Sequence, residues 1–231
     1  GTVVHMSAGL AAFAGAIFHG QRKKIIEKPA NIPFVILGTG MLWFGWFGFN
    51  AGSALGANFD AVIAFANTSL ASATSMISWI FYDRFSNRKM SSVGACIGAI
   101  VGLVAITPAA GFVTLGQSIF IGFIAAIVSN IAVKINKKSK VDDTLDVFAT
   151  HGIGGIVGMI LTAVFANEVG LIYGETTTFI YHIITIIITI VFTLLMSYLL
   201  FKLVDLVIPL RVREDQEERG LDLSQHGEVV I

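Results

Sequence analysis

Two histidines, His5 and His151, each interrupt a stretch that is otherwise as apolar as a membrane span. An ionisable side chain is costly at membrane depth, usually faces the interior of a helix bundle, and is by default a candidate functional residue. The neutral imidazole ring carries one nitrogen that donates and one that accepts, so it can exchange a proton near neutral pH. The alternative is a structural histidine hydrogen-bonded to a neighbouring helix.

A second candidate site lies in the aromatic segment 43–53. Trp46, Phe49, Asn50 and Ser53 are spaced i, i+3, i+4 and i+7, which places them on one helical face. An aromatic ring beside a hydroxyl suits a small cation that sheds water, because a desolvated cation–π contact is worth about 2 kcal/mol. The alternative is a belt of aromatic side chains at the outer membrane interface.

The elements that must position these residues are membrane helices. The 231-residue chain is 55% hydrophobic and only 13% charged, whereas a soluble domain has about 25% charged residues. A bilayer core needs roughly 20 mainly apolar residues per helix. We therefore predict an all-α, polytopic bundle of about seven transmembrane helices, at Thr2–His19, Pro33–Ser53, Ala61–Phe81, Ser91–Thr107, Leu115–Val133, Val147–Ala166 and Thr177–Phe201.

The basic residues fall only in alternate connections, which predicts an orientation. The fifteen are Arg22, Lys23, Lys24, Lys28, Arg84, Arg88, Lys89, Lys134, Lys137, Lys138, Lys140, Lys202, Arg211, Arg213 and Arg219. Positive connections stay in the cytoplasm, so the carboxyl tail is predicted to be cytoplasmic and the first span to start outside. We divide the chain into a transmembrane domain, residues 1–208, and a cytoplasmic tail, residues 209–231.

The two histidine-bearing spans enter the membrane from opposite sides, and each histidine is followed four residues later by glycine, at Gly9 and Gly155. Inverted repeats with matching residues at the midplane are a common transporter plan. His5, however, lies only about 6 Å from the start of the chain. We therefore expect the first span to begin before Gly1, so that the chain is N-terminally incomplete.

Small residues and carboxylates have simpler expected roles. Glycines four apart at Gly94, Gly98 and Gly102, and at Gly154 and Gly158, predict close helix packing. Gly152 is open to two interpretations, packing or room for a small solute. Asp142, Asp143 and Asp146 precede or open the sixth span, where carboxylates cap free N–H groups; the alternative is that they help cations leave a pore.

Several motifs together resemble the ammonium transporter family (Amt/Mep/Rh), its Amt branch in particular. They are Gly1-Thr2-Val3-Val4-His5, Gly45-Trp46-Phe47-Gly48-Phe49-Asn50-Ala51-Gly52-Ser53, Ile106-Thr107-Pro108-Ala109-Ala110-Gly111, Asp142-Asp143, Asp146-Val147-Phe148, His151-Gly152, Leu210-Arg211-Val212, Gly220-Leu221-Asp222 and His226-Gly227-Glu228. The resemblance runs through the whole chain but covers only the last seven of the family's eleven spans.

The resemblance implies a homotrimer in the plasma membrane with one narrow apolar pore per subunit. Ammonium would be recruited at an outer vestibule that includes Ser53, deprotonated, and passed along His5 and His151. Phe49 matches the gating phenylalanine, Trp46 a pore-lining residue, and Asp146 the structural carboxylate beneath the second histidine, while Asn50 is a supporting residue. The tail would dock on the cytoplasmic face, within reach of a PII-type regulatory protein.

Other functions remain as alternatives. An ammonium sensor shares the family fold, a fragment that does not transport is a further reading, and two membrane histidines could ligate haem. No cofactor, metal site or enzymatic activity is expected, because the sequence has neither a nucleophile–base pair nor metal-ligand spacing and Cys96 is its one thiol. Zero net charge gives no indication of a nucleic-acid partner.

Overall fold

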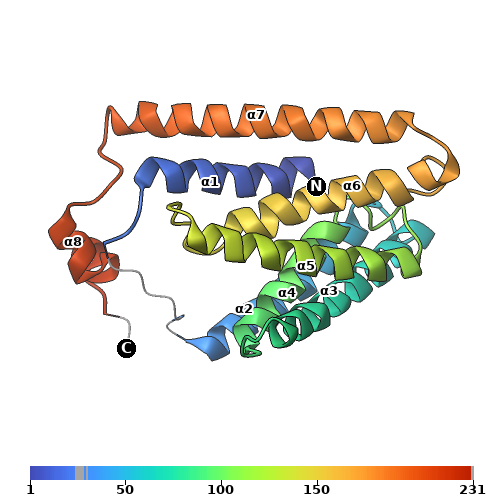
Figure 1. Cartoon of the computed structure of the whole chain (residues 1–231), viewed down its shortest axis with the longest axis horizontal. Coiled ribbons are helices and arrows are strands. Elements are labelled where there is room, and N and C mark those ends of the chain that lie inside the picture. Colours follow the sequence, from blue (N-terminus) through green and yellow to red (C-terminus); the bar gives the residue numbers. More distant parts are fainter. Residues whose placement is uncertain (24–28, 30, 230–231) are drawn as a thin grey trace.

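The computed structural model describes residues 1–23, 29 and 31–229, and its regular elements within that part of the chain are all helical (Figure 1). The main helices are α1 (Ser7–His19), α2 (Ile32–Gly52), α3 (Phe59–Phe85), α4 (Ser92–Ile106), α5 (Leu115–Lys138), α6 (Gly154–Phe165), α7 (Thr177–Asp205) and α8 (Glu214–Arg219). Three π-helical segments, Thr2–Met6, Phe148–Ile153 and Asp222–His226, and a short 3₁₀ turn, Leu171–Tyr173, complete the set. The predicted basic positions Lys24 and Lys28 lie outside the described residues.

Each predicted span corresponds to a helix, but one of them is short. Among the described residues six helices are long and apolar enough to cross a membrane, two of them when α1 and α6 are counted with the π-helical segments that precede them. The exception, α4, has only 15 residues, or about 22 Å. Its carboxyl-terminal half is wholly enclosed by protein, since Val101 and residues 103–106 are 0% exposed. A helix surrounded by others needs no lipid-facing length of its own.

Side chains at the helix ends explain where several helices begin. Asn31, Asn58 and Ser91 each accept a hydrogen bond from the backbone N–H three residues on, which caps α2, α3 and α4. Thr114 and Gln117 bond each other's backbone at the start of α5, a reciprocal capping box. These contacts satisfy N–H groups that would otherwise lack partners at the membrane boundary.

Glycines let α3, α4, α5 and α6 approach backbone to backbone, as the spacing of small residues predicted. A Cβ added to Gly102 of α4 would lie 2.4 Å from the Ala71 carbonyl oxygen of α3. One added to Gly158 of α6 would lie 2.4 Å from the Ala105 carbonyl oxygen of α4. The glycines are therefore packing positions. In a bilayer the lipid tails are as apolar as the helices, so close packing has to replace the hydrophobic drive to associate.

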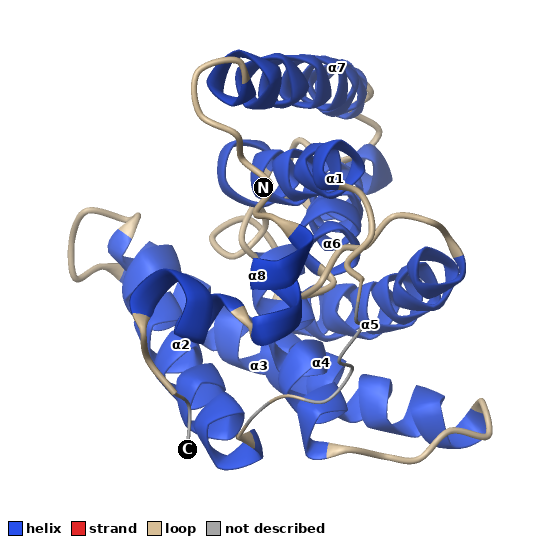
Figure 2. Cartoon of the chain, turned by 90° about the vertical axis from the view of Figure 1, so that its left-hand side faces the viewer, coloured by secondary structure: helices blue, strands red, loops and turns tan. Residues whose placement is uncertain are grey.

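The remaining helices lie around this core. α7 runs along α1, on the side away from α3 and α4 (Figures 1 and 2). Most of its exposed side chains are apolar, the composition expected of a surface that faces lipid tails. We call the end of the bundle that carries the Lys and Arg connections the basic end.

A short charged helix ended by glycine was predicted in the tail, and α8 is that helix. It ends at Gly220, whose φ of 93° an L side chain rarely adopts. Figure 1 places α8 at the basic end, by the end of α1. Arg211 and Glu217 hold the tail there through hydrogen bonds with the end of α1 and the connection after it.

Candidate functional site

The two histidines predicted to act together lie side by side in the structure. Their Nδ1 atoms are 3.3 Å apart and their ring centroids 5.4 Å apart. His5 is 2% exposed, and His151 is half-buried. Each stands in a π-helical segment, Thr2–Met6 or Phe148–Ile153, that runs directly into an α-helix. Single π-helical turns within α-helices are frequently found at functional sites.

A glycine contact brings these two segments together. A Cβ added to Gly9 would lie 2.1 Å from the Gly152 backbone nitrogen and 2.4 Å from its Cα. The space beside Gly152 is therefore filled by the Gly9 backbone and by the ring of Phe148, whose Cδ2 would be 3.0 Å from an added Cβ. This excludes the interpretation that Gly152 leaves room for a solute. Its absent side chain permits the helix crossing that sets the distance between the histidines.

Thr107, which sequence reasoning had not singled out as a site residue, joins His5 to the aromatic segment. Its hydroxyl donates to the Leu103 carbonyl at 2.8 Å and accepts from the indole N–H of Trp46 at 2.9 Å. His5 Nε2 lies 3.2 Å from the same oxygen. The Thr107 amide bonds the Val104 carbonyl instead of Leu103, so the hydroxyl supplies the partner that the Leu103 carbonyl would otherwise lack.

The residues that share one face of the aromatic segment divide into two groups. The Trp46 ring stacks on His5 with centroids 5.3 Å apart and planes 10° apart. Phe49 meets the His5 ring edge-on at 6.3 Å and keeps 41% of its surface exposed. Asn50 turns away from them, because its amide donates to the Thr68 hydroxyl of α3 at 2.9 Å. It thereby joins α2 to α3.

Two cavities flank Phe49. The one at the end opposite the basic end has a volume of about 460 Å³ and is lined by Phe49, Asn50, Ser53, Ala54, Asp60, Ala64, Thr107, Ala110, Gly111 and Phe112. The other, about 720 Å³ and almost wholly apolar, is lined by Val4, His5, Ala8, Gly38, Met41, Leu42, Gly45, Trp46, Phe49 and His151. Phe49 belongs to both linings, so it lies at the boundary of the two spaces. Ser53 lies in the first, with its hydroxyl donating to the Phe49 carbonyl at 2.8 Å.

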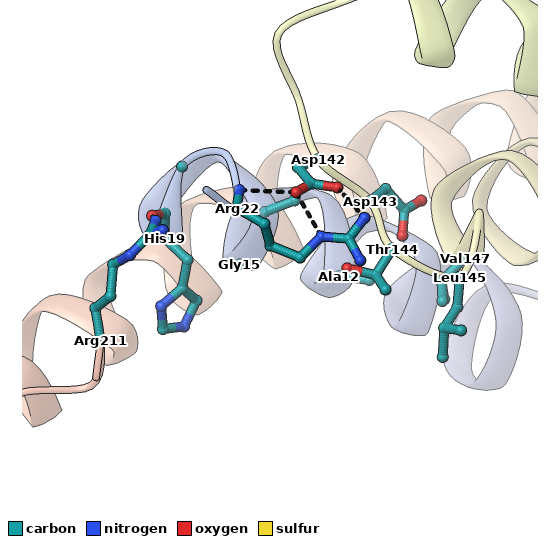
Figure 3. Close-up of a pocket in the computed structure, with 12 residues that line it drawn as sticks. Ala12, Gly15, His19, Arg22, Asp142, Asp143, Thr144, Leu145, Val147 and Arg211 are labelled. Atoms are coloured by element: carbon teal, nitrogen blue, oxygen red, sulfur yellow. Dashed lines mark hydrogen bonds and ion pairs between the residues drawn. The ribbon is translucent and has the colours of Figure 1, made fainter. Parts of the chain in front are cut away.

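At the basic end, the carboxylates before the second histidine have separate roles. Asp143 accepts from the Phe148 backbone N–H at 2.7 Å, so it provides the predicted helix cap. Asp142 instead binds Arg22 in the connection after α1, through the Nε and Nη2 atoms at 2.7 Å each (Figure 3). Hydrogen bonding by that guanidinium lowers the pKa of the Asp142 carboxyl below its ordinary value.

Asp146, predicted to support the second histidine from below, contributes through its backbone. Its φ of 54° is in the left-handed region, and its carbonyl accepts from both the N–H and the hydroxyl of Thr150, at 2.9 and 2.8 Å. Its carboxylate lies 3.9 Å from Lys137 Nζ, and burial raises the pKa of that carboxyl. The segment that leads into His151 is thus held at Asp142, Asp143 and Asp146.

Comparison with known proteins identifies the class. The model of the Ammonium Transporter Family matches residues 1–231. The chain is 47% identical over 234 residues to an ammonium transporter of Aquifex aeolicus, and 44% identical over 237 residues to one of Bacillus subtilis. These matches cover 99% of this chain and 55% and 59% of the two relatives. The chain belongs to the ammonium transporter family and spans somewhat more than half the length of these relatives.

Solved structures agree with this assignment. The crystal structure of Candida albicans Mep2 superposes with a TM-score of 0.87 at 34% identity, over 97% of this chain and 54% of that one. A structure titled sensor Amt protein superposes with a TM-score of 0.88 at 31% identity, over 97% of this chain and 58% of the other. The predicted family and fold class, an all-helical bundle of membrane-spanning helices, are thereby confirmed.

Proposed function

We propose that this chain forms part of an ammonium transporter, in which His5 and His151 line the conducting path and pass ammonia and its proton between them. The observation that carries this proposal is the 3.3 Å contact between their Nδ1 atoms. The pair lies beside an apolar cavity, and Phe49 lies at the boundary between that cavity and a more polar one. Relatives named as transporters reach 47% identity, against 31% for the sensor Amt structure, so we favour transport over sensing.

Recruitment of the cation begins at the outer cavity. The Ser53 hydroxyl donates its one hydrogen to the Phe49 carbonyl, so only its lone pairs are left for a ligand. A group that can only accept suits ammonium, which has N–H donors alone. The Phe49 ring adds an attractive π face for the same charge. We assign Ser53 to recruitment and Phe49 to the gate beneath it.

The hydrogen bonds of Thr107 support one assignment of the hydrogens on the two histidines. With the hydroxyl hydrogen on Leu103, the oxygen accepts from His5, which puts the hydrogen of the His5 ring on Nε2. His5 Nδ1 is then an acceptor, and the hydrogen between the rings belongs to His151 Nδ1. His151 Nε2 is left with a free lone pair. We propose it as the atom that takes up the proton of ammonium.

Deprotonation follows from the polarity change across Phe49. An ammonium ion that enters an apolar space loses its hydration without full compensation. Neutral ammonia carries a much smaller penalty, so release of the proton to the imidazole pair is favoured at this boundary. Trp46, stacked on His5, closes one side of the path and holds the ring in place.

The wider setting is proposed on the same basis. The distribution of Lys and Arg supports a cytoplasmic position for the basic end and the tail and an outer position for the Ser53 cavity. The family likeness favours a homotrimer in the plasma membrane and a PII-type regulator at the cytoplasmic face. Contacts between the tail and the connection after α1 support a docked regulatory segment.

The first prediction tests the histidine pair. In the full-length protein reconstituted into liposomes, His5→Ala and His151→Ala should each lower the ammonium-driven current by about 100-fold or more, as expected when a proton-transfer group is lost. Near-normal thermal melting would show that folding is retained. His226→Ala, which removes an exposed tail histidine, is the matched control. Full current in either pore variant would rule out a conducting role for the pair.

A further inference from the structure

The turn that joins α7 to the tail, residues 206–209, is apolar throughout and highly exposed. Leu206, Val207 and Ile208 keep 83%, 80% and 63% of their surface exposed, and Pro209 is exposed as well. Turns that face water are usually built from Gly, Asn, Asp, Ser and Pro. Figure 1 shows the chain leaving α7 at the basic end and running from there to α8. A turn with three exposed aliphatic side chains in a row needs a partner other than water.

The backbone of this turn does not depend on water for its donors. The N–H groups of residues 206, 207 and 208 donate to carbonyls in the last turn of α7, at 3.1, 2.9 and 2.8 Å. Pro209 has no N–H, and the Leu210 N–H donates to the Asp205 carboxylate at 2.8 Å. A segment in contact with lipid has to satisfy its backbone groups internally. The hydrogen bonding of the turn meets that condition for every N–H from residue 206 to residue 210.

The turn continues a helix surface that faces lipid. α7 has 29 residues and is therefore about 43 Å long, whereas a bilayer measures about 40–45 Å including its headgroup regions. The end of the helix therefore reaches the level of the headgroups. In its last turn Leu203 and Val204 are exposed, so the apolar surface of α7 extends to the turn that follows.

Basic side chains lie on both sides of the turn. Lys202 precedes it, with its Nζ atom 5.3 Å from the centre of the Tyr198 ring. The exposed Arg213 follows it and also pairs with Asp215 at 3.3 Å. A lysine beside a tyrosine is typical of the membrane interface, where the aliphatic stem lies in the apolar region and the charge reaches the headgroups. Apolar side chains between basic ones therefore fit a lipid leaflet, which offers acyl chains and anionic headgroups together.

We propose that residues 206–209 form an interfacial anchor, whose aliphatic side chains insert among the acyl chains of the leaflet at the basic end. The partner is the lipid itself, because the turn adjoins the lipid-facing surface of α7 and satisfies its own donors. The anchor sets the point from which the tail leaves the membrane, so that α8 starts from a fixed position by the end of α1. This role is separate from conduction along the histidine pair.

The test is the environment of a nitroxide attached to Val207→Cys in the full-length protein, reconstituted into liposomes of phosphatidylcholine and phosphatidylglycerol. Oxygen concentrates among the acyl chains, whereas a neutral nickel chelate stays in water, so relaxation by each reagent reports the surroundings. Oxygen should relax this label several-fold more effectively than the chelate. Val229→Cys, at an exposed valine beyond α8, is the matched control and should show the opposite preference. Cys96 is buried, and labelling of the unsubstituted protein measures any contribution from it.

A second variant tests the anchoring role. Leu206→Ser combined with Val207→Ser keeps the backbone donors of the turn and removes its apolar surface. Hydrogen exchange in residues 206–210 should then rise several-fold in liposomes, with the melting temperature nearly unchanged because both side chains are exposed. Unchanged exchange would show that lipid contact does not hold the turn.

Two results of the nitroxide measurement would overturn the proposal. A label at Val207→Cys that the chelate relaxes more effectively than oxygen lies in water. A label shielded from both reagents lies against protein, either a neighbouring subunit or a regulator. Failure of the transport function is recognised separately, because it is measured as a loss of ammonium current and leaves the position of the label unchanged.

Discussion

Thr107 has the most connected side chain of the site, since one hydroxyl serves a backbone carbonyl, an indole and an imidazole. A serine or threonine near a helix end normally bonds only the carbonyl four residues back. Here the two remaining lone pairs face Trp46 and His5 and fix the orientation of both side chains. The motif around Thr107 was noted in the sequence as part of the family likeness, but a single threonine before a proline carries no signal of its own.

At the residue scale we predict that Thr107→Val, which keeps the shape of the side chain and removes its oxygen, will leave Trp46 and His5 without the group that orients them. The His5 Nε2–H and Trp46 N–H would lose their acceptor, at a cost of about 1–3 kcal/mol for each buried donor. Transport by the full-length protein should fall and its melting temperature should drop, whereas Thr107→Ser should retain both. A Thr107→Val protein with normal transport would show that the tautomer of His5 is not set by this hydroxyl.

At the scale of elements, the site depends on where α1 and the segment before α6 cross. Hydrophobic runs and charge placement sufficed to locate every span, because membrane helices must satisfy their own backbone and must be apolar. The π-helical turns at both histidines could not be read from sequence, since an extra residue in a turn leaves no compositional mark. The contact of Gly9 with Gly152 could not be predicted either, because a glycine in a sequence indicates close packing but not which residue packs against it.

We predict that Gly9→Ala will be strongly destabilising, because its Cβ would meet the Gly152 backbone at 2.1 Å and neither helix can move without displacing a histidine. Overpacking of this kind costs about 3 kcal/mol. Thermal unfolding of the detergent-solubilised full-length protein measures it. Gly116→Ala in α5, whose added Cβ meets nothing within 4 Å, is the matched control. Equal melting temperatures for the two variants would contradict the close crossing.

At the scale of the whole molecule, the tail and the two histidine-bearing helices meet at the basic end. Arg211 donates to the carbonyls of His19 and Gln21 after α1. Glu217 of α8 accepts from the Lys23 backbone at 2.7 Å and pairs with Arg211 at 2.9 Å. The sequence predicted a charged helix ended by glycine, but these partners, nearly two hundred residues away in the chain, could come only from the fold.

We predict that Glu217→Gln will loosen the tail, because one carboxylate holds both a backbone N–H and a guanidinium there. The pKa of Glu217 is lowered by the hydrogen bond from the Lys23 backbone and by that from Arg211, so the charged form is the one that binds. Hydrogen exchange in residues 211–223 should rise several-fold, and transport or its regulation should fall while membrane insertion is unaffected. Glu218→Gln alters the neighbouring, exposed carboxylate and should change neither the hydrogen exchange nor the transport. Unchanged exchange in Glu217→Gln would identify the tail as independent of these contacts.

The hydrogen bonds around His5 can also be considered as a proton wire. A proton taken up at His151 Nε2 can shift one hydrogen across the ring contact to His5, but it can travel no further, because Thr107 has already given its hydrogen to the Leu103 carbonyl. A carbonyl oxygen has no hydrogen to hand on, and the indole of Trp46 can only donate. The wire is therefore closed at one end. Under the proposed function, any proton that the pair receives would leave by the imidazole that faces the path, so charge would not leak sideways into the helix bundle while ammonia moves through it.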